Sequence, residues 1–314
     1  MLARIQQLTT TGLVLAALVW AMYFAAHDHP MWATFGALLI VFGYALFLAA
    51  EFVVMWFVNR ADPAPRATPW QHVVAWWGEV TTAPRVFCWN QPFLSNAVPD
   101  CLEPQADSRG VVFVHGFVCN RGLWNPLMRK LRQARVPFAA VNLEPVFGSI
   151  DHYADIVDAA VRRVESATGK APVVVGHSMG GLAIRAWMDA HSGDQRAHRI
   201  ITIGTPHHGT YLGRYAMTPN ARQMNLSSDW QRRLSAREPA ERFERFTCFY
   251  GHCDNIVFPA STATLARADN RHIAGTAHVH MAFHADVFSE VMRWSGSIGA
   301  EASAETSSKP TLAR

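Results

Sequence analysis

The stretch Val173-Val174-Val175-Gly176-His177-Ser178-Met179-Gly180-Gly181 joins a short apolar run to a G-x-S-x-G pattern, and a helical pattern follows over residues 181–191. The apolar run predicts a buried strand. A serine on the sharp turn between a strand and a helix adopts a strained backbone conformation, and glycines two residues to either side let the two elements approach closely. The pattern therefore predicts that Ser178 is a nucleophile at the edge of a sheet.

Two backbone amides near Ser178 are candidates for an oxyanion hole. The helix that begins behind Ser178 directs its first N–H groups and its positive dipole end toward the hydroxyl. Residues 111–117, Val-Val-Phe-Val-His-Gly-Phe, read as a second buried strand that ends in a loop. We therefore expect the N–H groups of Met179 and Phe117 to be the two donors.

Short apolar runs alternate with longer amphipathic segments from Gly110 onward, which predicts an α/β fold with a mostly parallel central sheet. The expected strands are residues 111–115, 138–143, 173–177, 199–204, 246–250 and 272–275. The expected helices are residues 71–80, 124–134, 150–168 and 181–191.

Three segments resemble the α/β-hydrolase superfamily, specifically its bacterial triacylglycerol lipase and esterase branch. They are V-H-G-F at 114–117, V-V-G-H-S-M-G-G at 174–181 and I-T-I-G-T-P-H-H-G-T at 201–210. The resemblance extends over residues 109–291 and implies an α/β-hydrolase fold. It also implies that His207 and His208 line the site. These two histidines lack a third ligand at a recognisable spacing, so we expect no metal site and no cofactor.

The nucleophile needs a histidine to take its proton and an acid to hold that imidazole. In this fold the chain order is serine, acid, histidine. Asp254 follows the expected strand 246–250 and is the predicted acid. His278 is the predicted base, with His280 as the alternative. The family's G-x-G-H loop is Gly275-Thr276-Ala277-His278 here, so alanine replaces its second glycine.

Residues 8–26 and 31–50 are uncharged, and at about 1.5 Å per residue each is long enough to cross about 30 Å of hydrocarbon. Only four residues separate them, which predicts a two-helix transmembrane hairpin over residues 1–60. A cleaved signal peptide is the competing interpretation of residues 1–26. Glu51 lies where the membrane core is already crossed, so we interpret it as an interfacial residue.

The remaining segments differ in composition. Residues 61–69 contain three prolines and read as a stiff linker to a hydrolase domain over residues 70–294. Within that domain, residues 207–245 form either a lid or a plain surface segment. Residues 295–314 have few large apolar side chains, which predicts a disordered tail.

Composition narrows the classes of function. The 314 residues are 50% hydrophobic and 17% charged, and the formal net charge of +4 is spread along the chain, so nucleic-acid binding is not indicated. The five cysteines form no C-x-x-C pair and predict no disulfide framework.

Arg4, Arg60 and Arg66 flank the hairpin, whereas its loop has no Lys or Arg. This asymmetry favours a bacterial inner-membrane protein with two spans and a cytoplasmic catalytic domain.

These features together predict a membrane-anchored serine hydrolase that cleaves lipid or small apolar carboxylic esters through an acyl-enzyme. An acyltransferase or a thioesterase would use the same triad. A catalytically idle hydrolase fold that serves as a binding module is the alternative from another class. The sequence does not predict the oligomeric state.

Overall fold

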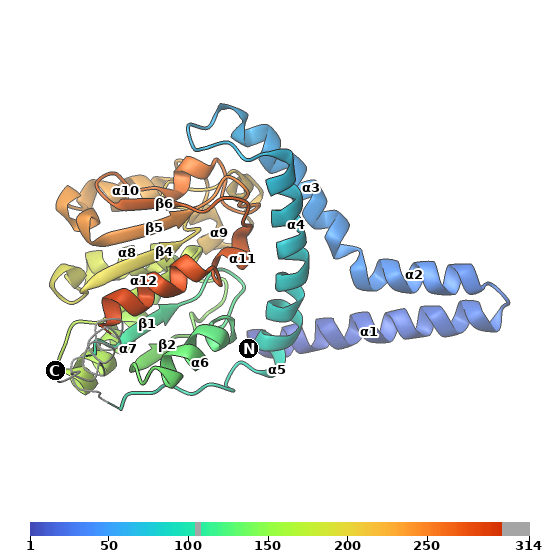
Figure 1. Ribbon diagram of the computed structural model, residues 1–314, viewed down its shortest axis with the longest axis horizontal. Coiled ribbons are helices and arrows are strands. Elements are labelled where there is room, and N and C mark those ends of the chain that lie inside the picture. Colours follow the sequence, from blue (N-terminus) through green and yellow to red (C-terminus); the bar gives the residue numbers. More distant parts are fainter. Residues whose placement is uncertain (104–107, 297–314) are drawn as a thin grey trace, which may run out of the picture.

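The computed structural model describes residues 1–103 and 108–296, and within them the strands form one six-stranded parallel sheet in the order β2-β1-β3-β4-β5-β6 (Figure 1). The strands are β1 Val111–Val114, β2 Phe138–Ala140, β3 Val173–His177, β4 Arg199–Ile203, β5 Phe246–Tyr250 and β6 Asp269–His272. Because all are parallel, their carboxyl ends meet at one edge of the sheet. The predicted α/β fold is confirmed. The expected tail lies almost wholly outside the described residues.

Helices cover both faces of the sheet. Val112 and Val174 pack in one apolar core with α7 (Ala154–Thr168) and α8 (Met179–Ala190). Their strand neighbours pack on the other face with α6 (Asn125–Gln133) and α12 (Ala285–Ser295), because successive strand side chains point to opposite faces. The other helices of the domain are α5 Gln91–Phe93, α9 Pro219–Gln223, α10 Asp229–Arg237 and α11 His278–Met281.

The last strand lies earlier in the chain than the sequence predicted. β6 covers Asp269–His272 and pairs with Thr247–Tyr250 of β5, whereas residues 273–275 are outside the strand. β6 is an edge strand with exposed or half-buried side chains. A strand at the edge of a sheet need not be apolar, so the hydrophobic pattern of the sequence does not reveal this polar strand.

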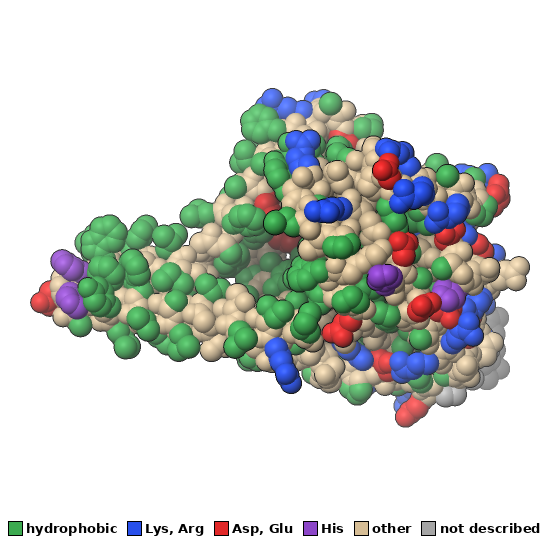
Figure 2. Space-filling view, turned by 180° about the vertical axis from the view of Figure 1, so that it is seen from behind, with side chains coloured by type: hydrophobic (Ala, Val, Ile, Leu, Met, Phe, Trp, Pro, Cys, Tyr) green, Lys and Arg blue, Asp and Glu red, His purple; other side chains and the backbone are tan. Residues whose placement is uncertain are grey.

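The N-terminal helices are α1 Leu2–Ala26, α2 Pro30–Phe42, α3 Tyr44–Val58 and α4 Pro69–Pro84. Helices α1 and α2 lie side by side and project away from the domain, while α3 turns back beside α4 (Figure 1). Large hydrophobic side chains are exposed along the projecting pair (Figure 2). By length and composition, Leu2–Ala26 and Tyr44–Ala61 are each able to cross a membrane.

The second apolar run is not the single helix over residues 31–50 that the sequence predicted. It is divided at Gly43 into α2 and α3. A Cβ atom at Gly43 would lie 2.4 Å from the carbonyl oxygen of Leu39, so the bend requires a residue without a side chain. Beyond the bend, α3 packs against α4 instead of continuing along α1.

Candidate active site

Ser178 occupies the turn between β3 and α8 with φ 55° and ψ −128°, a strained conformation for a residue with a side chain. A Cβ atom at Gly176 would lie 2.7 Å from the amide nitrogen of Gly181. A Cβ atom at Gly180 would lie 2.3 Å from the carbonyl oxygen of Val114. Both glycines of the motif therefore permit the close approach that the sequence predicted.

The loop after β1 lies directly beside Ser178. A Cβ atom at Gly116 would be 2.8 Å from the Cβ atom of Ser178, so the backbone that leads to Phe117 passes close to the serine. Met179 is the first residue of α8, where backbone N–H groups have no acceptor within the helix. The Thr205 hydroxyl donates a hydrogen bond to the carbonyl oxygen of Ser178 at 2.9 Å, a contact that no motif indicated.

Asp254 and His278 form a buried pair. Nδ1 of His278 donates to Oδ2 of Asp254 at 2.9 Å. Oδ1 of Asp254 accepts hydrogen bonds from the amides of Ile256 at 3.0 Å and Val257 at 2.8 Å. Asp254 is 2% exposed and His278 is 4% exposed. The loop after β5 thus fixes the carboxylate, and the carboxylate orients the imidazole.

The surroundings of His278 favour its protonated form. Burial by itself lowers the pKa of an imidazole, but the carboxylates of Asp254, Glu79 and Glu51 outweigh it, so the pKa of His278 is raised. Nε2 of the neighbouring His177 donates to the carbonyl oxygen of His278 at 3.1 Å. Burial lowers the pKa of His177 to about 3, so this second ring stays neutral at physiological pH.

The other histidines considered from the sequence lie elsewhere. The ring of His280 lies against Gly78 of α4 and does not line the cavity that contains His278. His207 is buried, and its Nε2 atom is 3.0 Å from the hydroxyl of Thr202. The exposed His208 and the buried His207 both lie outside the site cavities, which corrects the expectation that they line the site. Among residues 1–103 and 108–296, no group of His, Cys, Asp and Glu is arranged to hold a metal ion.

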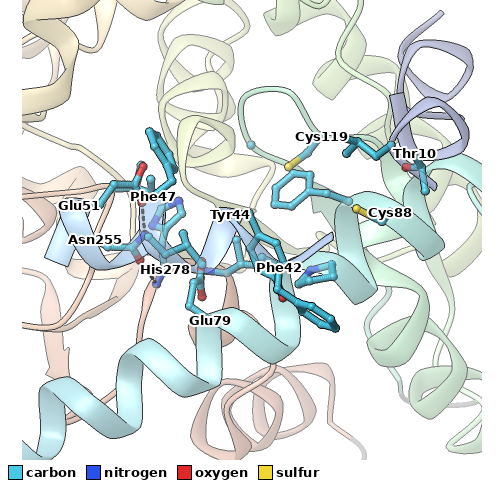
Figure 3. A pocket seen from close by; sticks show the side chains of 18 of the residues that line it. Thr10, Phe42, Tyr44, Phe47, Glu51, Glu79, Cys88, Cys119, Asn255 and His278 are labelled. Atoms are coloured by element: carbon cyan, nitrogen blue, oxygen red, sulfur yellow. Dashed lines mark hydrogen bonds between the residues drawn. The ribbon is translucent and has the colours of Figure 1, made fainter. Parts of the chain in front are cut away.

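Two carboxylates from the N-terminal helices support the loop that carries His278. Glu79 of α4, 2% exposed, accepts hydrogen bonds from the amides of Val279 at 3.0 Å and His280 at 3.0 Å. Burial raises the pKa of Glu79. Glu51 of α3 accepts from Nδ2 of Asn255 at 2.7 Å, and Oδ1 of Asn255 is 3.3 Å from the amide of His278 (Figure 3).

The roles of these two acids were not predicted from the sequence. Glu79 has no motif around it, and Glu51 was interpreted as an interfacial residue. The only signal in the sequence is a single acid within each of two apolar helical segments, which is costly unless the acid has a partner.

Ser178 and His278 line one cavity of about 690 Å³, together with Glu51, Glu79 and Asn255. Ser178 and Phe117 also line a second cavity of about 380 Å³. The first volume is within the range of about 300–1,000 Å³ that is usual for ligand sites. A hydroxyl on a strained turn and an oriented imidazole in one such cavity are the elements of nucleophilic catalysis.

Solved lipase structures share this fold. The chain is similar to the mature form of Bacillus licheniformis lipase BlEst2, with 16% identity over 61% of this chain and 91% of that chain and a TM-score of 0.51. It is also similar to Aspergillus fumigatus lipase B, with 19% identity over 60% of this chain and about half (51%) of that chain and a TM-score of 0.51. None of the curated proteins compared with the chain matches it. The family model described as "Alpha/beta hydrolase family" matches residues 111–299, more than half of the chain. The chain therefore belongs to the alpha/beta hydrolase family.

Proposed function

We propose that the protein is a membrane-anchored serine hydrolase that cleaves carboxylic esters through an acyl-enzyme. The observation that carries this proposal is that Ser178, on its strained turn, lines the same cavity as His278, whose Nδ1 atom is bonded to Asp254. The lipase structures that share the fold agree with an ester substrate. The mostly apolar lining of the cavity suits an apolar acyl chain.

In the acylation step, Oγ of Ser178 attacks the ester carbonyl carbon while Nε2 of His278 accepts the hydroxyl proton. The carboxylate of Asp254 stabilises the imidazolium that results. The N–H groups of Phe117 and Met179 stabilise the negative oxygen of the tetrahedral intermediate. The intermediate then collapses, the bond to the alcohol breaks, and His278 returns the proton to the departing oxygen.

In the deacylation step, His278 takes a proton from a water molecule, and the resulting hydroxide attacks the acyl group on Ser178. The second tetrahedral intermediate uses the same two amides. Its collapse releases the carboxylic acid, and His278 returns the proton to Oγ of Ser178. The enzyme is thereby regenerated without any cofactor.

Covalent labelling of the full-length protein in detergent tests the proposal. A fluorophosphonate probe reacts only with an activated serine, so the peptide that contains Ser178 should gain the mass of the probe. Ser178→Ala should lose both labelling and hydrolysis of p-nitrophenyl butyrate, because only the hydroxyl is removed.

The matched control is Ser149→Ala, since Ser149 is a half-buried serine at the start of a short helical turn and lines neither site cavity. This variant should retain both signals. Labelling that persists in Ser178→Ala would overturn the assignment of the nucleophile. A folded wild-type protein that is neither labelled nor active would point to the binding-module alternative.

We also propose that the protein lies in a bacterial inner membrane with its hydrolase domain in the cytoplasm. Arg4, Arg60 and Arg66 flank the apolar helices on the side of the domain, whereas the loop over residues 27–30 has no Lys or Arg. A fluorescent protein fused after Arg314 should therefore fluoresce, and alkaline phosphatase at the same position should stay inactive. The opposite pair of results would place the domain in the periplasm.

A further inference from the structure

The larger site cavity is formed by two parts of the chain. The nucleophile and the base lie on the hydrolase side, whereas α1, α2 and α3 supply an apolar wall that includes Val14, Phe42 and Leu48. In Figure 3, Glu51, Asn255, Glu79 and His278 gather at one end of the cavity, and Cys119, Cys88 and Thr10 lie toward the other end. Removal of the N-terminal helices would leave the cavity open on that side.

Buried polar contacts hold both ends of this wall on the hydrolase domain. Near the start of α1, Nε2 of Gln6 donates to Oε1 of Gln91 at 2.8 Å, and both side chains are buried. After α3, Asn59 is 1% exposed and donates to the carbonyl oxygen of His252 at 3.1 Å. Its Oδ1 atom accepts from the amide of Ala260 at 3.1 Å. The helices are therefore a fixed part of the site, since hydrogen bonds between buried groups are costly to break.

Charge limits which ligand fits. Within the described part of the chain, neither site cavity has a Lys or Arg in its lining, and the acids that line the larger one are Glu51 and Glu79. A phosphate group in this space would have no Lys or Arg to pair with and would face two carboxyl groups. The walls therefore suit an uncharged ester.

The smaller cavity extends from Ser178 in another direction. It is lined by residues of the 206–224 segment, among them Leu212, Met217 and Met224, and it shares Phe117 and Ile256 with the larger cavity. The two cavities meet at the nucleophile, which is where the acyl part and the alcohol part of an ester must diverge.

We propose that the N-terminal helices form one side of the acyl-chain site, so that the substrate is an uncharged ester of a long-chain fatty acid. The acyl chain lies in the larger cavity between α1, α3 and α4, and the alcohol part lies in the smaller cavity beside residues 206–224. This inference rests on the proposed function. It makes the apolar hairpin a determinant of chain length as well as an anchor.

Two tryptophan substitutions on one helix test the proposal. Leu48 lines the larger cavity, whereas Leu46, two residues earlier on α3, is 66% exposed and does not. Full-length Leu48→Trp should lose about tenfold or more in kcat/KM for a p-nitrophenyl palmitate, because the larger side chain fills space that the chain needs. Its kcat/KM for the butyrate should fall less, so that the ratio of the palmitate value to the butyrate value drops below that of the wild type. Leu46→Trp should match the wild type on both esters.

Equal chain-length profiles for Leu48→Trp and Leu46→Trp would overturn the proposal while leaving the ester hydrolase intact. A wild-type protein that neither hydrolyses the butyrate nor reacts with the fluorophosphonate would instead refute the proposed function. If Leu48→Trp does not fold, Leu13→Trp against Leu15→Trp repeats the comparison on α1, where Leu13 lines the cavity and Leu15 does not.

A second substrate pair tests the charge argument. In mixed micelles, a neutral diacylglycerol should be cleaved at least about tenfold faster than phosphatidic acid with the same acyl chains, since the phosphate finds no Lys or Arg in either cavity and faces Glu51 and Glu79 in the larger one. Equal rates, or a preference for phosphatidic acid, would overturn the assignment of an uncharged substrate.

Discussion

The carboxyl edge of the sheet and the N-terminal helices form opposite sides of one cavity but have different chemistry. The sheet side supplies Ser178 on the turn after β3, His278 at the start of α11, and Asp254, which follows β5 and is hydrogen-bonded to His278. The helix side supplies apolar side chains and the two acids Glu51 and Glu79. Those acids contact the loop of His278 through backbone amides and through Asn255.

If the proposed function holds, the reacting groups and the groups that select the substrate lie in separate parts of the chain. A reacting group must be held to within a fraction of an ångström, so its neighbours are constrained to glycines, tight turns and oriented hydrogen bonds. A wall for an acyl chain needs only apolar side chains of suitable size. Substitutions on the sheet side should therefore change the rate for every ester, and substitutions on the helix side should change the preference among esters.

The largest expected effect is on the sheet side. His278→Ala should lower kcat by about 10⁴-fold or more for short and long esters alike, because the serine loses its base. His280→Ala is the matched control, two residues further along the same short helix and outside the cavity. It should change kcat by less than about tenfold. Stopped assays with butyrate and palmitate esters measure both, and the reverse ranking would move the base to His280.

The sheet side was largely predictable from the sequence, and the reason is steric. The strained Ser178 and the glycines beside it satisfy a local requirement that leaves a pattern in consecutive residues. Apolar runs likewise predicted β1 and β3, because a buried parallel strand must be apolar on both faces. The choice of Asp254 and His278 rested on chain order and on the resemblance to the family's loops, and the structure brings the two side chains to hydrogen-bonding distance.

The helix side could not be predicted in the same way. The contact of Glu79 with Val279 joins residues 200 positions apart, and no local pattern records such a pairing. The helix bends at Gly43, where the sequence predicted one straight span. The bend could not be predicted, because a single glycine in an apolar run is equally compatible with an unbroken helix. The predicted position of the polar strand β6 was also wrong. Hydrophobic periodicity does not detect a polar strand at the edge of a sheet.

A smaller effect is expected where the helix side contacts the catalytic loop. Glu79→Gln should lower kcat/KM about tenfold, the equivalent of one weakened hydrogen bond to a charged group. It should also shift the acid limb of the pH profile to lower pH. His278 must be neutral to act as a base, so its pKa sets the acid limb. Glu79 contributes to the raised pKa of His278, and loss of the Glu79 charge should therefore lower the pKa of His278.

Glu290→Gln is the matched control for Glu79→Gln, because Glu290 is equally buried at 2% exposure but pairs with Arg271 away from the cavity. The acid limb of the pH profile of Glu290→Gln should coincide with that of the wild type, even if the substitution lowers the stability of the fold. A Glu79→Gln enzyme with an unmoved acid limb would reduce Glu79 to a purely structural contact.

The smallest expected effect is at Glu51, whose hydrogen-bonded connection to His278 runs through Asn255. Glu51→Gln keeps an oxygen that accepts from Asn255, so kcat/KM should fall by only about two- to threefold, as for a weak charge interaction. The acid limb should move in the same direction as in Glu79→Gln but less far, because Glu51 contributes less than Glu79 to the raised pKa of His278. The preference for palmitate over butyrate should not change, since glutamine has nearly the volume of glutamate. A loss of activity as large as that of Glu79→Gln would show that α3 belongs to the catalytic machinery and not only to the wall, and the division between the two sides of the cavity would then fail at this residue.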